Sequence, residues 1–340
     1  MRSALPPDLV YCRHSGNLDN FELMKIVVLD GYAMNPGDLS WDALKALGEL
    51  TLYDRSTLQE TLARTRDAAI ILTNKAVVSA EVIERATHLK YIGVMATGFN
   101  VVDLKAAAAR GIVVSNVPTY STVSVAQHTF ALILALANQT ARYGESVAAG
   151  DWVKSKDFSY LIAPLLELEG KTLGIVGLGR IGQAVAKIGL AFGMKVIAVH
   201  KHPERDRMEG VSFTDIRTLF EQADFISLHC PLNEANQYFV NRQLLESMKS
   251  TAFLINTSRG PLIQEQDLAD ALNKGRIAGA ALDVLTVEPP VADNPLFGAR
   301  NCLITPHIGW ATREARTRLM TVITDNLRSF LEGTPVNVVV

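Results

Sequence analysis

Cysteine is scarce in this chain, since its 340 residues include only Cys12, Cys230 and Cys302. Their number is odd and their spacing is wide, which argues against a disulfide framework and against a clustered zinc site. So few thiols are typical of a protein from a reducing compartment. We therefore expect a cytoplasmic protein that binds no metal.

The chain also lacks a strong net charge and long apolar runs. Its 33 Lys and Arg residues and 35 Asp and Glu residues give a formal charge of −2, so no general attraction to nucleic acid or to an anionic membrane is expected. The longest apolar runs, such as Thr129–Ala137, fall well short of the roughly 20 residues needed to span a bilayer. The expected partner is therefore a small molecule, and neither nucleic acid nor a membrane.

The first 23 residues contain no continuous apolar segment and do not look like a secretory signal. Met24 and Lys25 directly precede the apolar run Ile26–Leu29, where the first strand is expected. We interpret residues 1–23 as an N-terminal extension and a candidate for disorder.

Two series of short apolar or β-branched runs follow, separated by helix-compatible stretches. Such alternation predicts parallel sheets whose crossover helices cover both faces. The first series is Ile26–Leu29, Glu49–Tyr53, Ala69–Leu72, Tyr91–Val94 and Ile112–Ser115; the second is Thr172–Val176, Lys195–His200, Phe225–Leu228, Ala252–Asn256, Ala278–Asp283 and Cys302–Thr305. The expected fold class is α/β, with two doubly wound parallel-sheet domains.

Two longer helical stretches set the expected domain boundaries. Residues 124–149 are rich in Ala and Leu and predict one long helix that links the domains. The amphipathic stretch Thr312–Leu331 is long enough to return to the first domain, and Gly333 and Pro335 stop it. We predict a first domain over residues 24–122 and 312–340 and a second domain over residues 123–311.

A glycine-rich turn opens the second domain. The strand ending at Val176 is followed by Gly177-Leu178-Gly179-Arg180-Ile181-Gly182 and then by a helical run to Phe192. In a strand, turn and helix of this kind, Gly177 permits the tight turn, Gly179 lets the backbone approach a pyrophosphate, and Gly182 lets helix and strand pack closely. These features predict a Rossmann domain that binds NAD(P), with Arg180 and Ile181 also at the cofactor.

The end of the next strand bears on the choice of cofactor. In NAD-binding domains an acidic residue at this point accepts hydrogen bonds from the ribose hydroxyls. This sequence has His200-Lys201-His202 instead, and a cationic cluster can pair with the 2′-phosphate of NADP. We expect NADP to be preferred. The alternative is a solvated loop end, with Glu204 or Asp206 reaching the ribose.

Three chemically complementary residues follow three successive strands of the second domain. They are Arg259, Glu288 and His307. A guanidinium can bind a substrate carboxylate, an imidazole can exchange a proton with a carbonyl oxygen, and a neighbouring carboxylate orients the imidazole and stabilises its protonated form. Because ligands of doubly wound sheets bind at the carboxyl ends of the strands, these residues are candidates for hydride-transfer chemistry on a 2-keto acid.

On these motifs, the chain resembles the D-isomer-specific 2-hydroxyacid dehydrogenases from Met24 to its C-terminus. The resemblance implies a catalytic set of Arg259, Glu288 and His307, and a first domain, flavodoxin-like, that contributes substrate contacts. It further implies cofactor contacts on the nicotinamide side at Cys230, Pro231, Thr257 and Asp283, with Asp283 at the carboxamide, and we add Gly309 to this group. The backbone amides of Thr97 and Gly98 would bind the substrate carboxylate, and Asn74 would either line the cleft or lie in a surface loop. Members of the family usually form homodimers.

Within that family, the segments Asn116–Thr122 and His307–Thr312 are most similar to glycerate dehydrogenases, also called hydroxypyruvate reductases. The resemblance therefore implies reduction of hydroxypyruvate or glyoxylate to D-glycerate or glycolate. D-Lactate-type and phosphoglycerate dehydrogenases remain alternatives. A different class, the non-catalytic NAD(H)-sensing scaffold similar to certain corepressors, is disfavoured because the chain has no long low-complexity tail and no basic patch.

Overall fold

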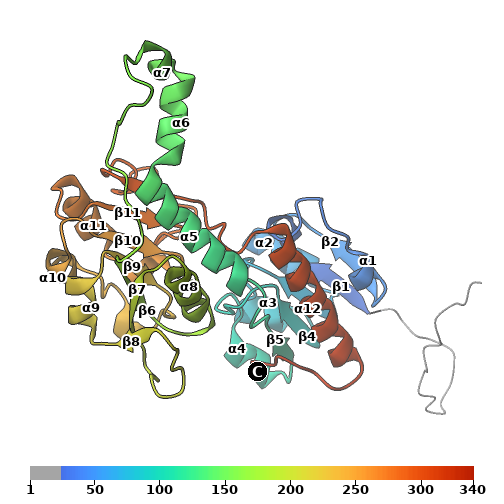
Figure 1. Cartoon of the computed structure of the whole chain (residues 1–340). Helices are drawn as coiled ribbons and strands as arrows, with labels where there is room; N and C mark the ends of the chain where they lie inside the picture. The colour runs from blue at the N-terminus through green and yellow to red at the C-terminus, as the bar shows by residue number, and fades with distance from the viewer. Residues whose placement is uncertain (1–23) are drawn as a thin grey trace, which may run out of the picture. The chain divides into compact units, whose positions relative to one another are not determined.

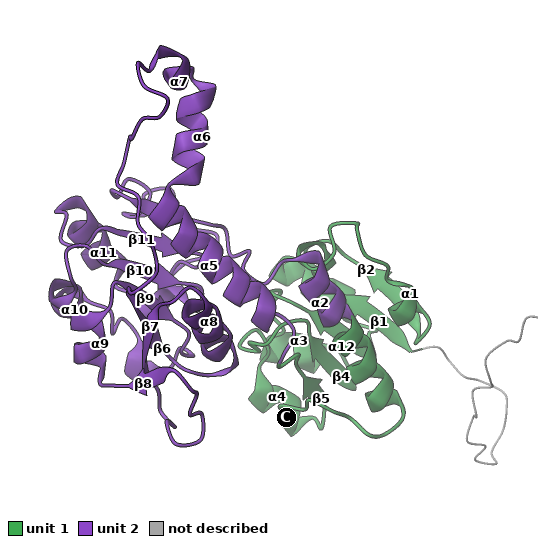
Figure 2. Ribbon diagram, in the orientation of Figure 1, with its two compact units in different colours: residues 1–118, 321–340 green, residues 119–320 purple. Residues whose placement is uncertain are grey.

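The computed structural model describes residues 24–340, and the predicted N-terminal extension lies outside the described residues. The described chain divides into two compact units (Figure 2). Unit 1 comprises the described residues up to Pro118 together with Thr321–Val340, and unit 2 comprises Thr119–Met320. The domain boundaries predicted from the sequence fell a few residues later at the first junction and nine residues earlier at the second. None of the helices in the described part is long and apolar enough to cross a membrane.

Unit 1 is built on a five-stranded parallel sheet in the order β2-β1-β3-β4-β5. Its elements are β1 (Lys25–Val28), α1 (Asp42–Lys45), β2 (Glu49–Leu52), α2 (Leu58–Arg64), β3 (Ile70–Thr73), α3 (Ala80–Arg85), β4 (Tyr91–Val94), α4 (Leu104–Ala109), β5 (Val113–Ser115) and the C-terminal part of α12 (Arg313–Leu331) (Figure 1). This strand order is that of flavodoxin-like domains. The predicted doubly wound fold of the first domain is confirmed.

Unit 2 contains a seven-stranded parallel sheet in the order β12-β11-β10-β9-β6-β7-β8. Its elements are α5 (Thr122–Asn138), α6 (Thr140–Ala148), α7 (Asp151–Lys154), β6 (Thr172–Val176), α8 (Arg180–Ala191), β7 (Lys195–Val199), β8 (Val211–Phe213), α9 (Ile216–Gln222), β9 (Phe225–Leu228), α10 (Arg242–Ser247), β10 (Phe253–Asn256), α11 (Glu265–Asn273), β11 (Gly279–Leu282) and β12 (Cys302–Ile304). Counted from β6, this is the Rossmann order 3-2-1-4-5-6 with one further strand. The order reverses at β6, so the crevice where such folds bind ligands lies at the carboxyl ends of β6 and β9.

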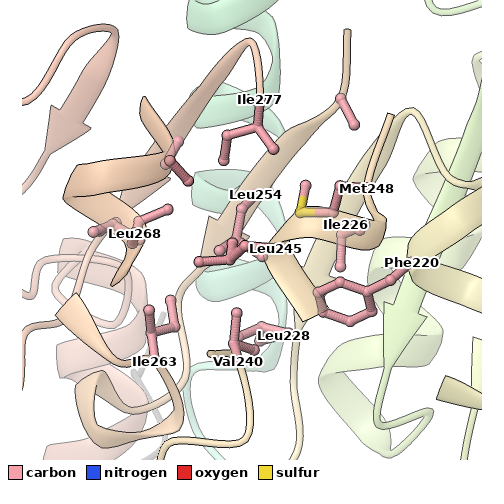
Figure 3. Packing of buried hydrophobic residues seen from close by; sticks show 14 of the residues in the cluster. Phe220, Ile226, Leu228, Val240, Leu245, Met248, Leu254, Ile263, Leu268 and Ile277 are labelled. Atoms are coloured by element: carbon pink, nitrogen blue, oxygen red, sulfur yellow. The ribbon is translucent and has the colours of Figure 1, made fainter. Parts of the chain in front are cut away.

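Alternating strand residues supply a core on each face of the unit 2 sheet, because successive side chains of a strand point to opposite sides. On one face, Phe225 and Phe253 stack with ring centroids 5.2 Å apart and pack with α5 and α8. On the other face, Ile226 and Leu254 pack with Phe220 of α9 and with α10 and α11 (Figure 3). The sheet is thus covered on both sides, which holds its strand ends in fixed positions.

Two elements differ from those predicted. The single helix expected over residues 124–149 is two helices, because Gln139 adopts a left-handed backbone with φ of 52° between α5 and α6. The break falls where burial ends: α5 buries nine of its side chains and α6 buries none. The short strand β8 was missed because its three residues, Val211, Ser212 and Phe213, form too short an apolar pattern to stand out.

Candidate active site

The glycine-rich turn has the geometry that its sequence predicts. Gly177 has φ of 99°, and a Cβ there would lie 2.6 Å from the backbone nitrogen of Cys230. A Cβ on Gly182 would lie 2.1 Å from the carbonyl oxygen of Gly177, so any side chain would push α8 away from β6. A Cβ on Gly179 would meet nothing within 4 Å, so this side of the turn is open towards a ligand. These residues fit a pyrophosphate at the N-terminus of α8.

His200, which follows β7, faces the glycine-rich turn. It was expected in a cationic cluster with Lys201 and His202. The backbone N–H of Leu178 donates to His200 Nδ1 over 3.1 Å, and His200 Nε2 lies 2.5 Å from Asp206 Oδ2. The ring proton therefore lies on Nε2, and only 11% of the side chain is exposed. His200 braces the glycine-rich turn, while Lys201 and His202 are exposed.

Asp206, which contacts His200 at the strand end, is paired with a cation. Arg205 donates to it through Nε and Nη2, at 3.0 and 2.5 Å. These bonds from Arg205, followed by the bond from His200, hold the pKa of the Asp206 carboxyl well below its usual range. The carboxylate is thus ionised, but its charge is balanced by the guanidinium.

The residues expected on the nicotinamide side lie at the ends of β9 and β10. Cys230 and Pro231 follow β9, and burial raises the pKa of the Cys230 thiol to about 11, so it is a neutral, unreactive group. Burial also lowers the pKa of the preceding His229 to about 3, which leaves that ring uncharged. Thr257 follows β10, and its hydroxyl lies 3.1 Å from that of Thr129 on α5. This side of the crevice therefore has little charge.

Arg259 lies on an exposed loop after β10 that is closely tied to its surroundings. Asn256 donates to the carbonyl of Arg259 at 2.9 Å, and Ser258 donates to the carbonyl of Cys230 at 2.7 Å. A Cβ on Gly260 would lie 2.0 Å from the carbonyl carbon of Leu285, so only glycine lets this loop approach the loop after β11. The guanidinium donates through Nη1 to the carbonyl of Ser258, which leaves other N–H groups for a ligand.

Glu288 and His307 form a hydrogen-bonded pair. His307 Nδ1 lies 2.6 Å from Glu288 Oε2, and Glu288 Oε1 accepts the backbone N–H of Leu285 at 3.0 Å. The carboxylate thus orients the ring and keeps a proton on Nδ1. Among residues 24–340, His307 Nε2 has no hydrogen-bond partner, and 28% of the side chain is exposed. The second nitrogen is free to exchange a proton with a ligand.

The loops that carry these three residues leave adjacent strands. In the sheet, β10, β11 and β12 are neighbours, and all three are parallel. Their carboxyl ends therefore lie along one edge, and Arg259, Glu288 and His307 follow these strand ends in the chain. The charge and proton chemistry predicted from the sequence is thus present on one side of unit 2.

Asp283, which was expected at the nicotinamide carboxamide, has other partners. Its carboxylate accepts hydrogen bonds from the Thr305 hydroxyl and from the backbone N–H groups of Ile308 and Gly309. With 2% of the residue exposed, it faces the loop that carries His307. Gly309, also expected at the cofactor, is buried against this carboxylate.

In unit 1, the residues predicted to contact substrate follow β3 and β4. Asn74 is 4% exposed, and its side-chain amide donates to the carbonyl of Met95, so it shapes the neighbouring loop. The Thr97 hydroxyl donates to the carbonyl of Val117, and Asn116 donates to the carbonyl of Thr97. Within the described chain, the backbone N–H groups of Thr97 and Gly98 have no acceptor. This loop is fixed in place and presents two adjacent donors.

An aromatic pair near the guanidinium of Arg259 was not predicted from the sequence. Tyr120 and Trp310 meet edge to face with ring centroids 6.4 Å apart. Burial raises the pKa of Tyr120 to about 12, opposed by the nearby charge of Arg259 and a hydrogen bond with Ser121. Both residues lie within the segments that suggested glycerate dehydrogenases, but the sequence could not show that they meet.

Comparison with known proteins places the chain in a family. Residues 130–309 match the family model described as D-isomer specific 2-hydroxyacid dehydrogenase, NAD binding domain. The chain is 48% identical over 321 residues to a hydroxypyruvate reductase of Blautia hydrogenotrophica, covering 93% of this chain and 99% of the relative. It is 40% identical over 285 residues to a glycerate dehydrogenase of Methylorubrum extorquens, covering 83% and 89% of the two chains. The structure of an acyclic imino acid reductase in complex with NADPH and D-Arg is 34% identical, with a TM-score of 0.81, and the match covers 93% of this chain and all of that one.

The Rossmann turn and the strand-end residues, taken with these matches, define an oxidoreductase that uses a nicotinamide cofactor. The chain belongs to the D-isomer specific 2-hydroxyacid dehydrogenase family. The resemblance inferred from the sequence motifs is thereby confirmed.

Proposed function

We propose that this enzyme reduces hydroxypyruvate or glyoxylate to D-glycerate or glycolate, with Arg259, Glu288 and His307 as its catalytic residues. The observation that carries the proposal is the pairing of His307 Nδ1 with Glu288 at 2.6 Å, with Nε2 left for a ligand. The names of the relatives from Blautia hydrogenotrophica and Methylorubrum extorquens support the choice of substrate.

The three side chains divide the chemistry of reduction among them. A bound nicotinamide cofactor supplies the hydride that reaches C2 of the keto acid. His307 Nε2–H donates a proton to the carbonyl oxygen at the same carbon, and the ring recovers that proton from solvent. Glu288 accepts from Nδ1–H throughout, so it stabilises the charged ring before transfer. Arg259 binds the substrate carboxylate through two parallel N–H groups.

We propose separately that the loop after β4 in unit 1 binds a carboxylate. The adjacent N–H groups of Thr97 and Gly98 suit a carboxylate oxygen, because each lacks an acceptor within residues 24–340. We do not extend this role to Asn74, because its amide is committed to the carbonyl of Met95.

We also propose that NADP is preferred to NAD. The strand-end position carries an imidazole where NAD-binding domains have a carboxylate, Asp206 beside it is paired with Arg205, and Glu204 is paired with Arg207. No uncompensated carboxylate therefore repels a 2′-phosphate there, and Lys201 is exposed and able to pair with it. Binding of NADPH by the related imino acid reductase supports this preference.

A panel of 2-keto acids, each assayed with NADPH and with NADH, tests both proposals. We expect the highest kcat/KM with hydroxypyruvate or glyoxylate, with pyruvate and phosphohydroxypyruvate lower. A higher value with pyruvate or phosphohydroxypyruvate would favour the D-lactate or phosphoglycerate alternative. No turnover of any keto acid, despite tight cofactor binding, would favour a non-catalytic scaffold.

Substitution at the strand end tests the cofactor preference separately. The double variant His200→Asp, Lys201→Ala restores the carboxylate and removes the cation, so we expect it to prefer NADH. Lys187→Ala removes an exposed cation on α8 and should leave the preference unchanged. A wild-type enzyme that prefers NADH about tenfold or more, roughly 1.4 kcal/mol, would contradict the proposal.

Two further assignments complete the proposal. We propose a homodimer, supported by exposed apolar side chains on residues 140–165, which are Val147, Trp152, Val153, Phe158, Leu161 and Leu165. We also propose a cytoplasmic location, supported by the free thiols of Cys230 and Cys302 in the described chain.

A further inference from the structure

The loop that carries His307 is held by a buried carboxylate. We call residues 305–309 the His307 loop. Asp283 Oδ1 accepts from the Thr305 hydroxyl at 2.6 Å and from the N–H of Ile308 at 2.9 Å, and Oδ2 accepts from the N–H of Gly309 at 2.8 Å. Burial raises the pKa of Asp283, but hydrogen bonds from His128 and from this loop outweigh it and lower the pKa overall. Asp283 is therefore ionised, and each of its two oxygens accepts at least one hydrogen bond from the protein.

The fourth donor to Asp283 comes from α5. His128 Nε2 lies 3.3 Å from Asp283 Oδ1 and 3.0 Å from the hydroxyl oxygen of Thr305. Because the Thr305 hydroxyl gives its own hydrogen to Asp283, its oxygen accepts from His128. The proton of His128 thus lies on Nε2, and this N–H contacts both partners. His128, Thr305 and Asp283 form a closed triangle of hydrogen bonds.

A second contact from α5 holds the other end of the loop. Ser124, one helical turn before His128, donates from its hydroxyl to the carbonyl of Gly309 at 2.6 Å. A Cβ on Gly309 would lie 2.9 Å from Asp283 Oδ2 and 3.3 Å from the His128 ring, so the loop backbone packs directly on these two side chains. Together, α5 and Asp283, the residue directly after β11, fix both ends of the His307 loop.

The residue between the two ends has a backbone conformation that needs such support. His307 has φ of 53°, in the left-handed region, which costs free energy for a residue with a side chain. Such conformations persist when the surrounding contacts impose them. The contacts of the His307 loop are therefore what directs the ring towards Glu288.

We propose that His128 and Asp283 are positioning residues that hold His307 in its proton-transfer geometry. The inference rests on the proposed role of His307. It assigns to Asp283 a task other than binding the nicotinamide carboxamide, and it gives α5 a function besides packing. Neither residue has to touch substrate for this role.

The test compares His128→Leu, which removes the donor, with His128→Gln, whose amide can donate from a similar position. With hydroxypyruvate and NADPH, we expect kcat of the Leu variant to fall about 10- to 100-fold, the scale of a misplaced catalytic group, with KM and NADPH affinity little changed. The Gln variant should recover most of the activity. Thr305→Val removes the hydroxyl from the same triangle and should resemble the Leu variant. Agreement between the two variants would exclude a defect caused by one substitution alone.

A second readout does not depend on turnover. The NMR titration of the His307 ring, assigned by its absence in His307→Gln, reports whether the ring still contacts Glu288. In folded His128→Leu we expect the midpoint to move towards that of Glu288→Gln, and in His128→Gln to stay near that of wild type. Wild-type kcat and an unmoved midpoint in both His128→Leu and Thr305→Val would overturn the proposal. A wild-type enzyme that turns over no keto acid would instead refute the proposed function, and the titration would still decide the positioning role.

Discussion

At the scale of single residues, the site depends on how each ionisable group is held. Glu288 accepts from Leu285 and from His307, so it is fixed before any ligand binds. Arg259 is exposed, and within residues 24–340 its guanidinium makes one hydrogen bond, to the carbonyl of Ser258. This contrast suits the two proposed roles. His307 would donate its proton from a fixed orientation, whereas Arg259 can adjust its position to bind the substrate carboxylate.

Replacement of Arg259 by lysine tests the carboxylate contact. Lysine keeps the charge but cannot bind a carboxylate through two parallel N–H groups. Loss of one charged hydrogen bond, about 1.5–3 kcal/mol, should lower kcat/KM for hydroxypyruvate roughly 10- to 100-fold, mostly through KM. Steady-state kinetics at fixed, saturating NADPH measures this effect.

The matched control is Arg217→Lys, because Arg217 lies on α9 and pairs with Glu221 on the same helix. We expect this variant to behave as wild type. If Arg259→Lys also kept its kcat/KM, the carboxylate-binding role would be refuted.

At the scale of elements, the sequence predicted every strand except β8, because each of the others lies in a compact apolar or β-branched run. The sequence predicted the glycine-rich turn equally well, since Gly177 and Gly182 are required by close contacts within the protein and Gly179 leaves room for a ligand. The sequence did not predict the break at Gln139, because α5 and α6 differ in burial and not in helix-forming residues. The orientation of the His200 side chain towards the glycine-rich turn could not be predicted either. It depends on a contact with Asp206, six residues later in the chain.

The contact between the loops after β10 and β11 is another feature of elements, and Gly260→Ala tests it. The added Cβ would fall 2.0 Å from backbone atoms of Leu285, which cannot move as a flexible side chain can. We expect a loss of about 1–3 kcal/mol in the free energy of unfolding and a lower kcat, because the loop that bears Glu288 is displaced. Chemical denaturation and steady-state kinetics measure the two effects.

Gly298→Ala is the control for this substitution. A Cβ at Gly298 would meet nothing within 4 Å, so stability and activity should stay near those of wild type. Equal behaviour of the two alanine variants would show that the loops do not need the close contact.

At the scale of the whole molecule, the apolar surface of α6, α7 and the segment after them requires explanation. Val153 and Phe158 are each 91% exposed, and Figure 1 shows α6 and α7 extending away from the sheet of unit 2. Exposed apolar groups that cluster in this way mark interaction surfaces. A two-fold dimer would cover them with the same segment of a second copy.

Light scattering at micromolar concentration tests the dimer. We expect twice the 37.0 kDa mass of one chain for the wild type and for Phe297→Asp, which alters an exposed phenylalanine outside this segment. The variant Val153→Asp, Phe158→Asp should shift towards the monomer mass. A monomeric wild type would contradict the dimer.

The central claim is that His307 exchanges a proton with the substrate carbonyl, and kcat of His307→Gln for hydroxypyruvate reduction by NADPH tests it most directly. Glutamine can still donate a hydrogen bond but cannot transfer a proton at neutral pH. The account predicts that kcat falls about 100-fold or more, the usual contribution of a general acid, with NADPH affinity unchanged. Turnover close to that of the wild-type enzyme would contradict it.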